Sequence, residues 1–446
     1  MWGLGLVLAA VVALGVWLWL SPPELLRVAD GYSAKMVCSN VFVAGRDADE
    51  VLSVDVQAPG NPVLKLVRLS VDTTGNSVTA SMLGLFAPMT AIYRPGLGCA
   101  LVPDGNLEAA RQIQLAHPDD VDPTGAWPLG ESVDPPDPAV QAVLGDPALT
   151  GPGMRAVVVI RDGKLVGEVY GDGFDEQTPL LGWSMTKTVN AVLVGMAMAD
   201  GKLTDGDAEI FPGWRNDPRK DITPGDLLSM TSGLAFNEDY GDVTDVTRML
   251  FLEPDMTAFA ASQPLVAPPR TKFNYSSGTA VLLAKLWMQR VGGGPTALRY
   301  PYERLFKPLG MTSAVLEADA SGTFVGSSYL YATARDWARF GQFLLQNGMW
   351  NGQQLVPAGF IGKMQTSNGL PGAYSQAQSW MDGPKGAYWS EIGLPFAFWL
   401  EGHDGQSIAV IPFKNMVVVR LGLTPWSKYG YGPEDMIKAI LAAVGG

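Results

Sequence analysis

A serine and a lysine three residues apart, Ser184 and Lys187, are the residues of this chain whose types and spacing best suit chemistry. If residues 185–199 form a helix, Ser184 lies at its N-terminus and Lys187 about one turn further on, on the same face. A serine hydroxyl becomes a nucleophile when a base lies within hydrogen-bond reach. A lysine serves as that base when desolvation or nearby positive potential lowers its pKa. The helix N-terminus and the apolar run behind it supply both influences.

The same four-residue spacing also occurs where a serine merely caps a helix and the lysine is solvated. Two further stretches place polar groups beside structural signals. Residues 273–278 bring Tyr275 and two serine hydroxyls just before a predicted helix, and residues 401–406 bring His403 just before a predicted strand. Taken singly, Tyr275 is a packing tyrosine and His403 a turn residue.

In this order, the three stretches resemble the penicillin-recognising serine hydrolases, which include the serine β-lactamases, the DD-peptidases and their esterase and amidase relatives. That family's signature is Ser-x-x-Lys, then a triplet containing Tyr or Ser, then Lys/His-x-Gly on a strand. Here the matching residues are Ser184 with Lys187, the triplet 275–277, and the stretch 403–405. The sequence is similar to the class C-like branch, and within it to the 6-aminohexanoate-dimer hydrolase-like proteins. The resemblance covers about residues 150–446.

The resemblance implies a mechanism in which the Ser184 hydroxyl attacks a carbonyl and forms an acyl-enzyme. Lys187 and Tyr275 would relay the proton, and either of them could be the general base. The backbone N–H groups of Ser184 and Gln406 would hold the oxyanion. Gly405 would let the substrate approach the strand closely, and His403 would line the pocket. Ser277 is placed with the substrate-binding residues.

Two departures from the family pattern bear on the substrate. The triplet ends in Ser277 where class C β-lactamases carry Asn, and the strand motif begins with His403 where β-lactamases and DD-peptidases usually carry Lys. A mostly neutral imidazole binds the carboxylate of a β-lactam poorly at pH 7. An ester or a short amide without that carboxylate is therefore the expected substrate, and no cofactor or metal is expected.

The elements that must position these residues follow from hydrophobic patterning. A hairpin over residues 156–170, with an Asp-Gly turn, is followed by a helix that is apolar on nearly every side and hence buried. Helical segments with Pro/Gly loops fill about residues 195–345, and a second hairpin (407–421) and a helix (433–444) end the chain. This order predicts an α/β (α+β) fold of the β-lactamase/transpeptidase type, in which an antiparallel sheet is flanked by helices and carries a helical insert.

The first 22 residues predict a membrane anchor. Residues 2–20 lack any charge, and tryptophans stand at both ends of the run, as in a transmembrane helix. A cleaved signal peptide is the alternative, although no basic residue precedes the run and no small-x-small site follows it. Next come a β-rich segment (23–117), a Pro-rich connector (118–152) and the hydrolase domain (153–446). Residues 63–71 and 77–81 are expected to be strands around a turn.

Cys38 and Cys99 are the only cysteines. In an exported protein they predict a disulfide, the alternative being two unrelated buried thiols. A disulfide places the hydrolase domain on the periplasmic or extracytoplasmic side, anchored to the membrane or released by signal cleavage. A net charge of −13 without a basic run excludes nucleic acid as a partner. The oligomeric state is left open. A catalytically silent member that binds cell-wall peptide or another partner is the alternative function.

Overall fold

The computed structural model describes residues 2–115, 124–384 and 397–445, and the chain divides into two compact units. Unit 1 contains residues 1–114, 237–259 and 317–322, and unit 2 contains residues 115–236, 260–316 and 323–446. The N-terminal unit therefore recruits two short segments from the region where the sequence predicts the helical insert.

Unit 1 is built on a four-stranded antiparallel sheet in the order β1-β2-β3-β4, against which helix α2 packs. The strands are β1 (Val67–Asp72), β2 (Ser77–Met82), β3 (Phe86–Arg94) and β4 (Gly98–Leu101). The helices are α1 (Trp2–Leu20), α2 (Glu24–Phe42), α3 (Ala48–Glu50), α4 (Leu107–Gln112) and α9 (Asp245–Leu252), with a π-helix at Val51–Gln57. Asp72 caps the predicted turn between β1 and β2 by accepting hydrogen bonds from the backbone N–H groups of Thr74 and Gly75.

The start of unit 1 differs from the β-rich segment that the sequence predicts. Residues 24–42 are helical, and residues 62–66 form a 3-10 helix because Asn61 caps it and Pro62 occupies its first turn. Helix α2 escapes detection because polar residues are interleaved with its buried apolar ones. Ser33, Lys35 and Ser39 are all buried, so the apolar periodicity is broken. The disulfide Cys38–Cys99 joins this helix to β4.

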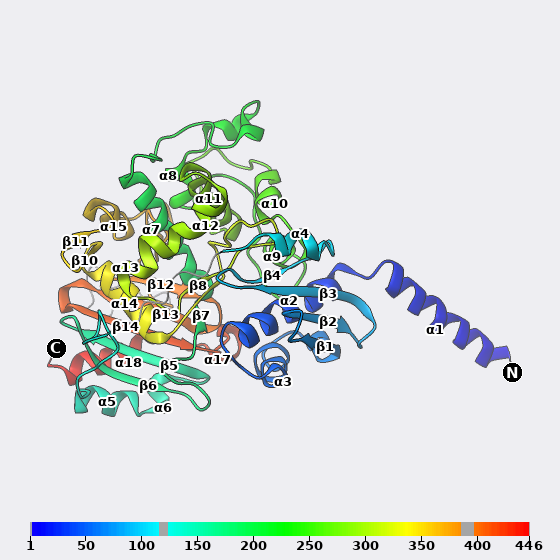
Figure 1. Ribbon diagram of the computed structural model, residues 1–446, viewed down its shortest axis with the longest axis horizontal. Coiled ribbons are helices and arrows are strands. Elements are labelled where there is room, and N and C mark those ends of the chain that lie inside the picture. The colour runs from blue at the N-terminus through cyan, green and yellow to red at the C-terminus, as the bar shows by residue number, and fades with distance from the viewer. Residues whose placement is uncertain (1, 116–123, 385–396, 446) are drawn as a thin grey trace. The chain divides into compact units, whose positions relative to one another are not determined.

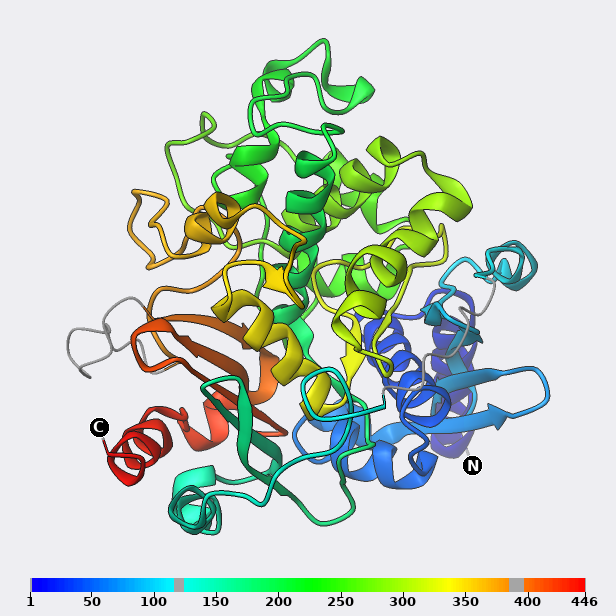
Figure 2. The same ribbon diagram turned by 60° about the vertical axis from the view of Figure 1, so that its left-hand side comes forward.

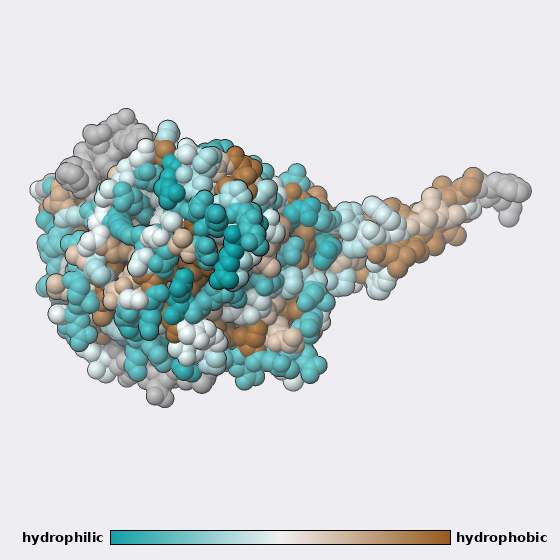
Figure 3. Space-filling model, turned by 90° about the horizontal axis from the view of Figure 1, so that it is seen from above, coloured by the Kyte–Doolittle hydropathy of each residue, from teal (hydrophilic) through white to brown (hydrophobic). Residues whose placement is uncertain are grey.

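Helix α1 carries exposed apolar side chains along most of its length, including Leu4, Leu8 and Trp19. Figure 3 shows the hydrophobic colouring of this helix. No single helix in the described part of the chain is long and apolar enough to cross a membrane, and Leu4–Leu20 and Glu24–Phe42 meet the length and composition criteria only as a pair bent by 59°.

Unit 2 is centred on a five-stranded antiparallel sheet in the order β12-β13-β14-β5-β6. Its strands are β5 (Met154–Arg161), β6 (Lys164–Tyr170), β12 (Phe398–Gly402), β13 (Gln406–Ile411) and β14 (Met416–Gly422). Successive side chains point to opposite faces, and both faces are buried, which explains the unbroken apolar run at residues 156–160. The two hairpins predicted from the sequence, β5–β6 and β13–β14, are therefore confirmed and lie side by side.

Helices cover both faces of this sheet (Figures 1 and 2). Helices α5 (Pro138–Leu144) and α18 (Glu434–Ala443) pack on one face, where Val140, Val159 and Ile437 share a core. Helix α14 (Ala334–Leu345) lies on the other face, so closely that a Cβ on Gly341 would lie 2.5 Å from a methyl group of Val417. The sequence and structure therefore agree on an α/β fold with antiparallel sheets.

The remaining elements of unit 2 surround this sheet. The helices are α6 (Pro147–Thr150), α7 (Thr186–Ala199), α8 (Pro224–Leu228), α11 (Ser277–Arg290), α12 (Gly294–Pro301), α13 (Lys307–Leu309), α15 (Ala358–Met364) and α17 (Trp426–Tyr429), while α10 (Met256–Ser262) crosses the boundary between the units. The short strands are β7 (Leu180–Leu181), β8 (Val315–Leu316), β9 (Leu330–Ala332), β10 (Met349–Trp350) and β11 (Gln353–Gln354).

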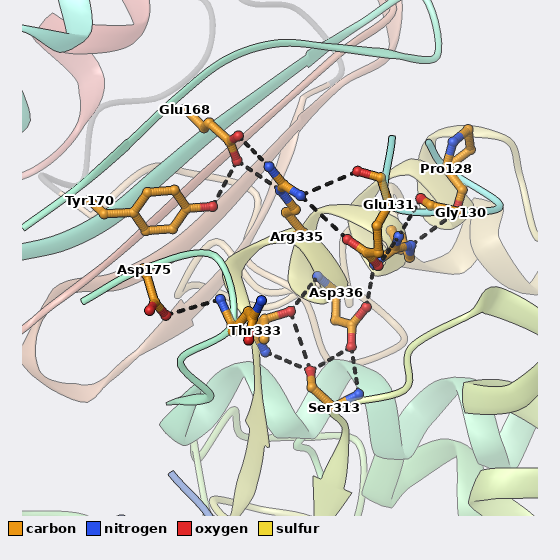
Figure 4. Close-up of polar contacts among 12 residues, drawn as sticks. Pro128, Gly130, Glu131, Glu168, Tyr170, Asp175, Ser313, Thr333, Arg335 and Asp336 are labelled. Carbon is orange, nitrogen blue, oxygen red and sulfur yellow. Dashed lines mark hydrogen bonds and ion pairs between the residues drawn. The ribbon is translucent and has the colours of Figure 1, made fainter. Parts of the chain in front are cut away.

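A polar network fixes α14 to its surroundings (Figure 4). Arg335 binds both carboxylate oxygens of Glu168 on β6, at 2.5 and 2.9 Å, and also contacts Glu131. Asp336 accepts hydrogen bonds from the backbone N–H and the hydroxyl of Ser313. Paired geometry of this kind between an arginine and a carboxylate is both strong and directional. The network holds the Pro-rich connector and the sheet edge on the same helix.

Candidate active site

Ser184 lies in a 3-10 turn, Trp183–Met185, that leads directly into the buried helix α7. Trp183, just before it, adopts a positive φ of 48°, a conformation that costs a bulky residue about 1–3 kcal/mol. Packing maintains it, since the indole is only 5 % exposed and contacts the rings of Tyr329 and His403. The turn that presents Ser184 is therefore strained but held on both sides of the ring.

Lys187 is buried, with 1 % of its surface exposed, and its Nζ lies 3.0 Å from the Oγ of Ser184. The same Nζ lies 3.0 Å from the Oγ of Ser277 and 3.1 Å from the backbone carbonyl oxygen of Ser327. These three contacts fix the amine beside the Ser184 hydroxyl. The arrangement can move a proton between a nucleophilic oxygen and a nitrogen.

The structure assigns the members of the triplet 275–277 different positions. Ser276 caps helix α11 by accepting a hydrogen bond from the N–H of Thr279. Ser277, the first residue of the helix, contacts Lys187. Ser277 is expected from the sequence among the substrate-binding residues, whereas here its hydroxyl contacts the lysine amine. Tyr275 lies with its ring centroid 4.7 Å from the Nζ of Lys187, a cation–π distance.

Tyr275 belongs to a cluster of aromatic side chains beside the serine and the lysine. Its ring lies 5.1 Å from that of Trp380 and 5.7 Å from that of Tyr374, and Phe273 packs against both partners. Tyr374 is buried, while Phe273, Tyr275 and Trp380 are half-buried. The surroundings of Lys187 on this side are therefore apolar and rigid.

The stretch 403–406 turns sharply from β12 into β13. Asp404 and Gly405 both adopt positive φ, 59° and 83°. His403 is 42 % exposed and its Nε2 lies 3.4 Å from Asp404. The rings of His403 and Trp183 pack edge to face, with 5.6 Å between their centroids. His403 therefore contacts the residue that directly precedes Ser184. A Cβ on Gly402 would lie 2.2 Å from the carbonyl oxygen of Gly182, so β12 passes directly against the serine turn.

Gly405 and Gln406 pack against β14 and the segment that follows it. The side-chain oxygen of Gln406 accepts a hydrogen bond from the N–H of Gly422, and its Nε2 donates to the carbonyl of Gly422. A Cβ on Gly405 would lie 3.0 Å from Arg420 and 3.1 Å from Thr424. Its positive φ and this packing both require a glycine here. The clearance for the substrate that the sequence predicts at Gly405 stays a prediction.

The structure brings Ser184, Lys187, Tyr275 and Ser277 into one cluster and connects His403 to it through Trp183. Sequence reasoning missed the carbonyl of Ser327, because a backbone group carries no side-chain signal, and the contact between Lys187 and Ser277. It also gave no role to the buried Arg420 on β14, which donates a hydrogen bond to the carbonyl oxygen of Gly405. Among the described residues, no group of three His, Cys, Asp or Glu side chains could hold a metal ion.

Comparison with known proteins identifies the family to which this chain belongs. Residues 147–423, more than half of the chain, match the model of the protein family described as beta-lactamase. A 6-aminohexanoate-dimer hydrolase from Paenarthrobacter ureafaciens is 23 % identical over 303 residues, which cover 60 % of this chain and 72 % of that protein.

Solved structures share the fold. A Bacillus anthracis protein provisionally named a 6-aminohexanoate-dimer hydrolase superposes with a TM-score of 0.55 at 21 % identity, covering 80 % of this chain and 90 % of its own. A penicillin-binding protein from Bacillus halodurans superposes with a TM-score of 0.52 at 18 % identity, covering 68 % and 99 %.

Proposed function

Because the chain belongs to the beta-lactamase family and is a hydrolytic enzyme of the serine-hydrolase type, we propose that it cleaves small esters or amides through an acyl-enzyme on Ser184. The 3.0 Å contact between the Nζ of Lys187 and the Oγ of Ser184 is the observation that supports this chemistry most directly. In a helix cap with a solvated lysine the amine would lie in water, whereas here it is buried and held on three oxygens.

In the first step, the Ser184 oxygen attacks the substrate carbonyl carbon while its proton passes to a neutral Lys187 amine. The tetrahedral oxyanion then collapses, the bond to the leaving alcohol or amine breaks, and the leaving group takes up the proton. Tyr275, whose ring covers Lys187, is the second candidate for this proton relay. Water next attacks the acyl-enzyme by the same route in reverse and releases the acid.

The oxyanion is held in this mechanism by the backbone N–H groups of Ser184 and Gln406. Donors aimed at the developing charge are often the largest single contribution to catalysis, and losing one costs about 3–4 kcal/mol. The contact of Trp183 with His403 and the approach of Gly402 to Gly182 support this pairing, because they bring the β12–β13 turn against the serine turn.

The substrate class follows from the surroundings of the site. The aromatic cluster around Tyr275 favours apolar acyl or alcohol groups, and His403 offers an imidazole where a β-lactamase has a permanent cation. The relative from Paenarthrobacter ureafaciens is named for the 6-aminohexanoate dimer, so short linear amides are part of the proposal.

A substrate panel tests the proposal on the full chain in detergent. The panel contains p-nitrophenyl esters of increasing chain length, a D-alanyl amide, the linear 6-aminohexanoate dimer and nitrocefin, each measured on the wild type and on Ser184→Ala. We expect ester or amide turnover that is lost in Ser184→Ala, with little nitrocefin turnover. Fast nitrocefin turnover would contradict the substrate class, and turnover that survives in Ser184→Ala would contradict the chemistry.

A catalytically silent protein that binds cell-wall peptide is the alternative. A fluorophosphonate probe separates the two, because covalent labelling that disappears in Ser184→Ala requires an activated serine. The buried contact between Lys187 and Ser184 favours the enzyme.

We further propose that α1 anchors the protein in a membrane, with unit 2 on the periplasmic or extracytoplasmic side. The exposed apolar side chains of α1 and the disulfide of unit 1 support this location. Retention in membranes after alkaline extraction, together with cleavage of unit 2 by protease added outside the cytoplasmic membrane, is the expected result. Release of a shortened chain would favour the cleaved signal instead.

A further inference from the structure

The buried side chain of Arg420 donates a hydrogen bond to the peptide group that supplies the oxyanion donor of Gln406. Its Nη1 lies 3.0 Å from the carbonyl oxygen of Gly405. The C=O of Gly405 and the N–H of Gln406 belong to one peptide group. A cation bound to the oxygen of a peptide draws electron density from it and makes its N–H a stronger donor.

The partners of Arg420 other than Gly405 are also neutral groups. Its other nitrogens bind the carbonyl oxygens of Thr150 and Pro152 and the hydroxyl of Thr424. The guanidinium also lies 4.8 Å from the centroid of the Tyr431 ring. Within the described part of the chain, Arg420 forms no ion pair with a carboxylate at 4.0 Å or less, and its four hydrogen-bond acceptors are neutral oxygens.

Arg420 is positively charged at neutral pH. Its side chain is fully buried, and burial lowers the pKa of the guanidinium to about 10. In so dry a setting the positive potential is weakly screened.

We propose that Arg420 is a positioning residue that strengthens the oxyanion site by polarising the peptide between Gly405 and Gln406. This inference rests on the proposed acyl-enzyme chemistry and adds to it a group that touches neither the substrate nor the reacting atoms. Arg420 has a second role in this proposal. Its hydrogen bond to Gly405 fixes the left-handed conformation of that residue and thereby the orientation of the N–H group of Gln406.

The test compares Arg420→Gln, Arg420→Lys and a matched control, Arg94→Gln, in the full chain. Arg94 is also a buried arginine that donates to a backbone carbonyl, that of Ala318, and burial lowers its pKa to about 10 as well. It belongs to unit 1, whereas Ser184, Lys187 and Gln406 belong to unit 2. Its substitution therefore reports the general cost of removing a buried arginine.

Hydrolysis of the best p-nitrophenyl ester and inhibition by a boronic acid, which forms an anionic tetrahedral adduct with the serine, are the two measurements. Arg420→Gln should lower kcat about 10- to 100-fold with KM changed less than threefold, and should weaken boronate inhibition by a similar factor. Arg420→Lys, which retains a basic group that can donate to the Gly405 carbonyl, should recover part of both. Arg94→Gln should leave both values within threefold of the wild type.

Equal kcat and boronate affinity in Arg420→Gln and the wild type would overturn the inference, as would a loss in Arg420→Lys as large as in Arg420→Gln. If Arg420→Gln does not fold, the boronate affinity of Arg420→Lys decides: values within threefold of the wild type support the role of charge, and a 100-fold loss refutes it. Ser184→Ala separates the two proposals, because turnover that survives in it refutes the acyl-enzyme itself, whereas Ser184-dependent turnover unaffected by Arg420→Gln refutes only the role of Arg420.

Discussion

Among single residues, Lys187 matters most for the proposed chemistry. Three oxygens from three different segments fix its amine. Ser184 comes from the turn before α7, Ser277 from the start of α11, and the Ser327 carbonyl from the segment before β9. A flexible four-carbon side chain loses much of its conformational freedom in such a site. The three contacts offset that loss and keep the amine within reach of the Ser184 hydroxyl.

We expect Ser277→Ala to lower kcat about 10- to 100-fold, because the Lys187 amine loses one of its three fixed partners and its alignment with Ser184 relaxes. The free energy of unfolding should fall by about 1 kcal/mol, the usual effect of losing one hydrogen bond. Steady-state kinetics and urea unfolding measure the two quantities. The neighbouring Ser276→Ala is the matched control, since it removes the cap of α11 and costs similar stability but leaves Lys187 untouched. Equal kinetic losses in both variants would contradict the role given to Ser277.

His403 is the residue that we expect to limit the turnover of β-lactams. Its side chain is 42 % exposed, so a lysine can replace it without burial of a new charge. His403→Lys should raise kcat/KM for nitrocefin at least tenfold, because a permanent cation then faces the β-lactam carboxylate. Turnover of a neutral p-nitrophenyl ester should change less than threefold. An unchanged nitrocefin rate would show that the histidine does not set the substrate class.

At the scale of elements, α2 and β2 are joined by a buried carboxyl group. The side chain of Asp30 accepts a hydrogen bond from the N–H of Met82 and is shielded from solvent. This burial raises the pKa of the carboxyl group to about 8. In the unfolded chain the same group titrates near 4. The folded state therefore holds a proton that the unfolded state releases between these two values.

The free energy of unfolding should consequently fall as the pH rises from about 4 to about 8, by up to about 5 kcal/mol from this group alone. Below pH 4 both states are protonated and no penalty arises. Asp30→Asn should remove this slope and be more stable than the wild type at pH 8, while the two proteins should be similar at pH 4. Urea unfolding at both pH values measures the difference. A stability difference that does not change with pH would contradict the prediction.

The disulfide between Cys38 and Cys99 also joins two elements, α2 and β4, across 61 residues of chain. Closing a loop of that length should contribute about 2–5 kcal/mol to stability. Cys38→Ala combined with Cys99→Ala should lower the unfolding temperature of unit 1 while ester hydrolysis at 25 °C, which depends on unit 2, remains within threefold. Calorimetry and p-nitrophenyl ester kinetics measure the two effects. A complete loss of hydrolysis in a folded double variant would contradict this separation.

At the scale of the whole molecule, the sequence predicts unit 2 far better than unit 1. The β5–β6 and β13–β14 hairpins and helices α7, α11 and α18 follow from apolar periodicity and turn residues. Helix α2 does not, because buried polar residues such as Lys35 interrupt its pattern. Lys35 pairs with Glu317, which is distant in sequence, and only the folded chain brings the two charges together.

The sequence likewise predicts one part of the candidate site and not the other. Ser184, Lys187 and Tyr275 are recognisable because their side chains and their order along the chain carry the signal. The Ser327 carbonyl and the contact of Arg420 with Gly405 depend on how the backbone packs, and no residue type marks them. Sequence thus predicts the candidate reactive groups, while the structure adds the backbone contacts around them.

The measurement that tests the acyl-enzyme most directly is intact-protein mass spectrometry after acid quenching of the enzyme during turnover of a p-nitrophenyl ester. We predict an added mass equal to the acyl group, located by digestion on the peptide that contains Ser184 and absent in Ser184→Ala. Turnover without any adduct on that peptide, and undiminished in Ser184→Ala, would contradict the mechanism.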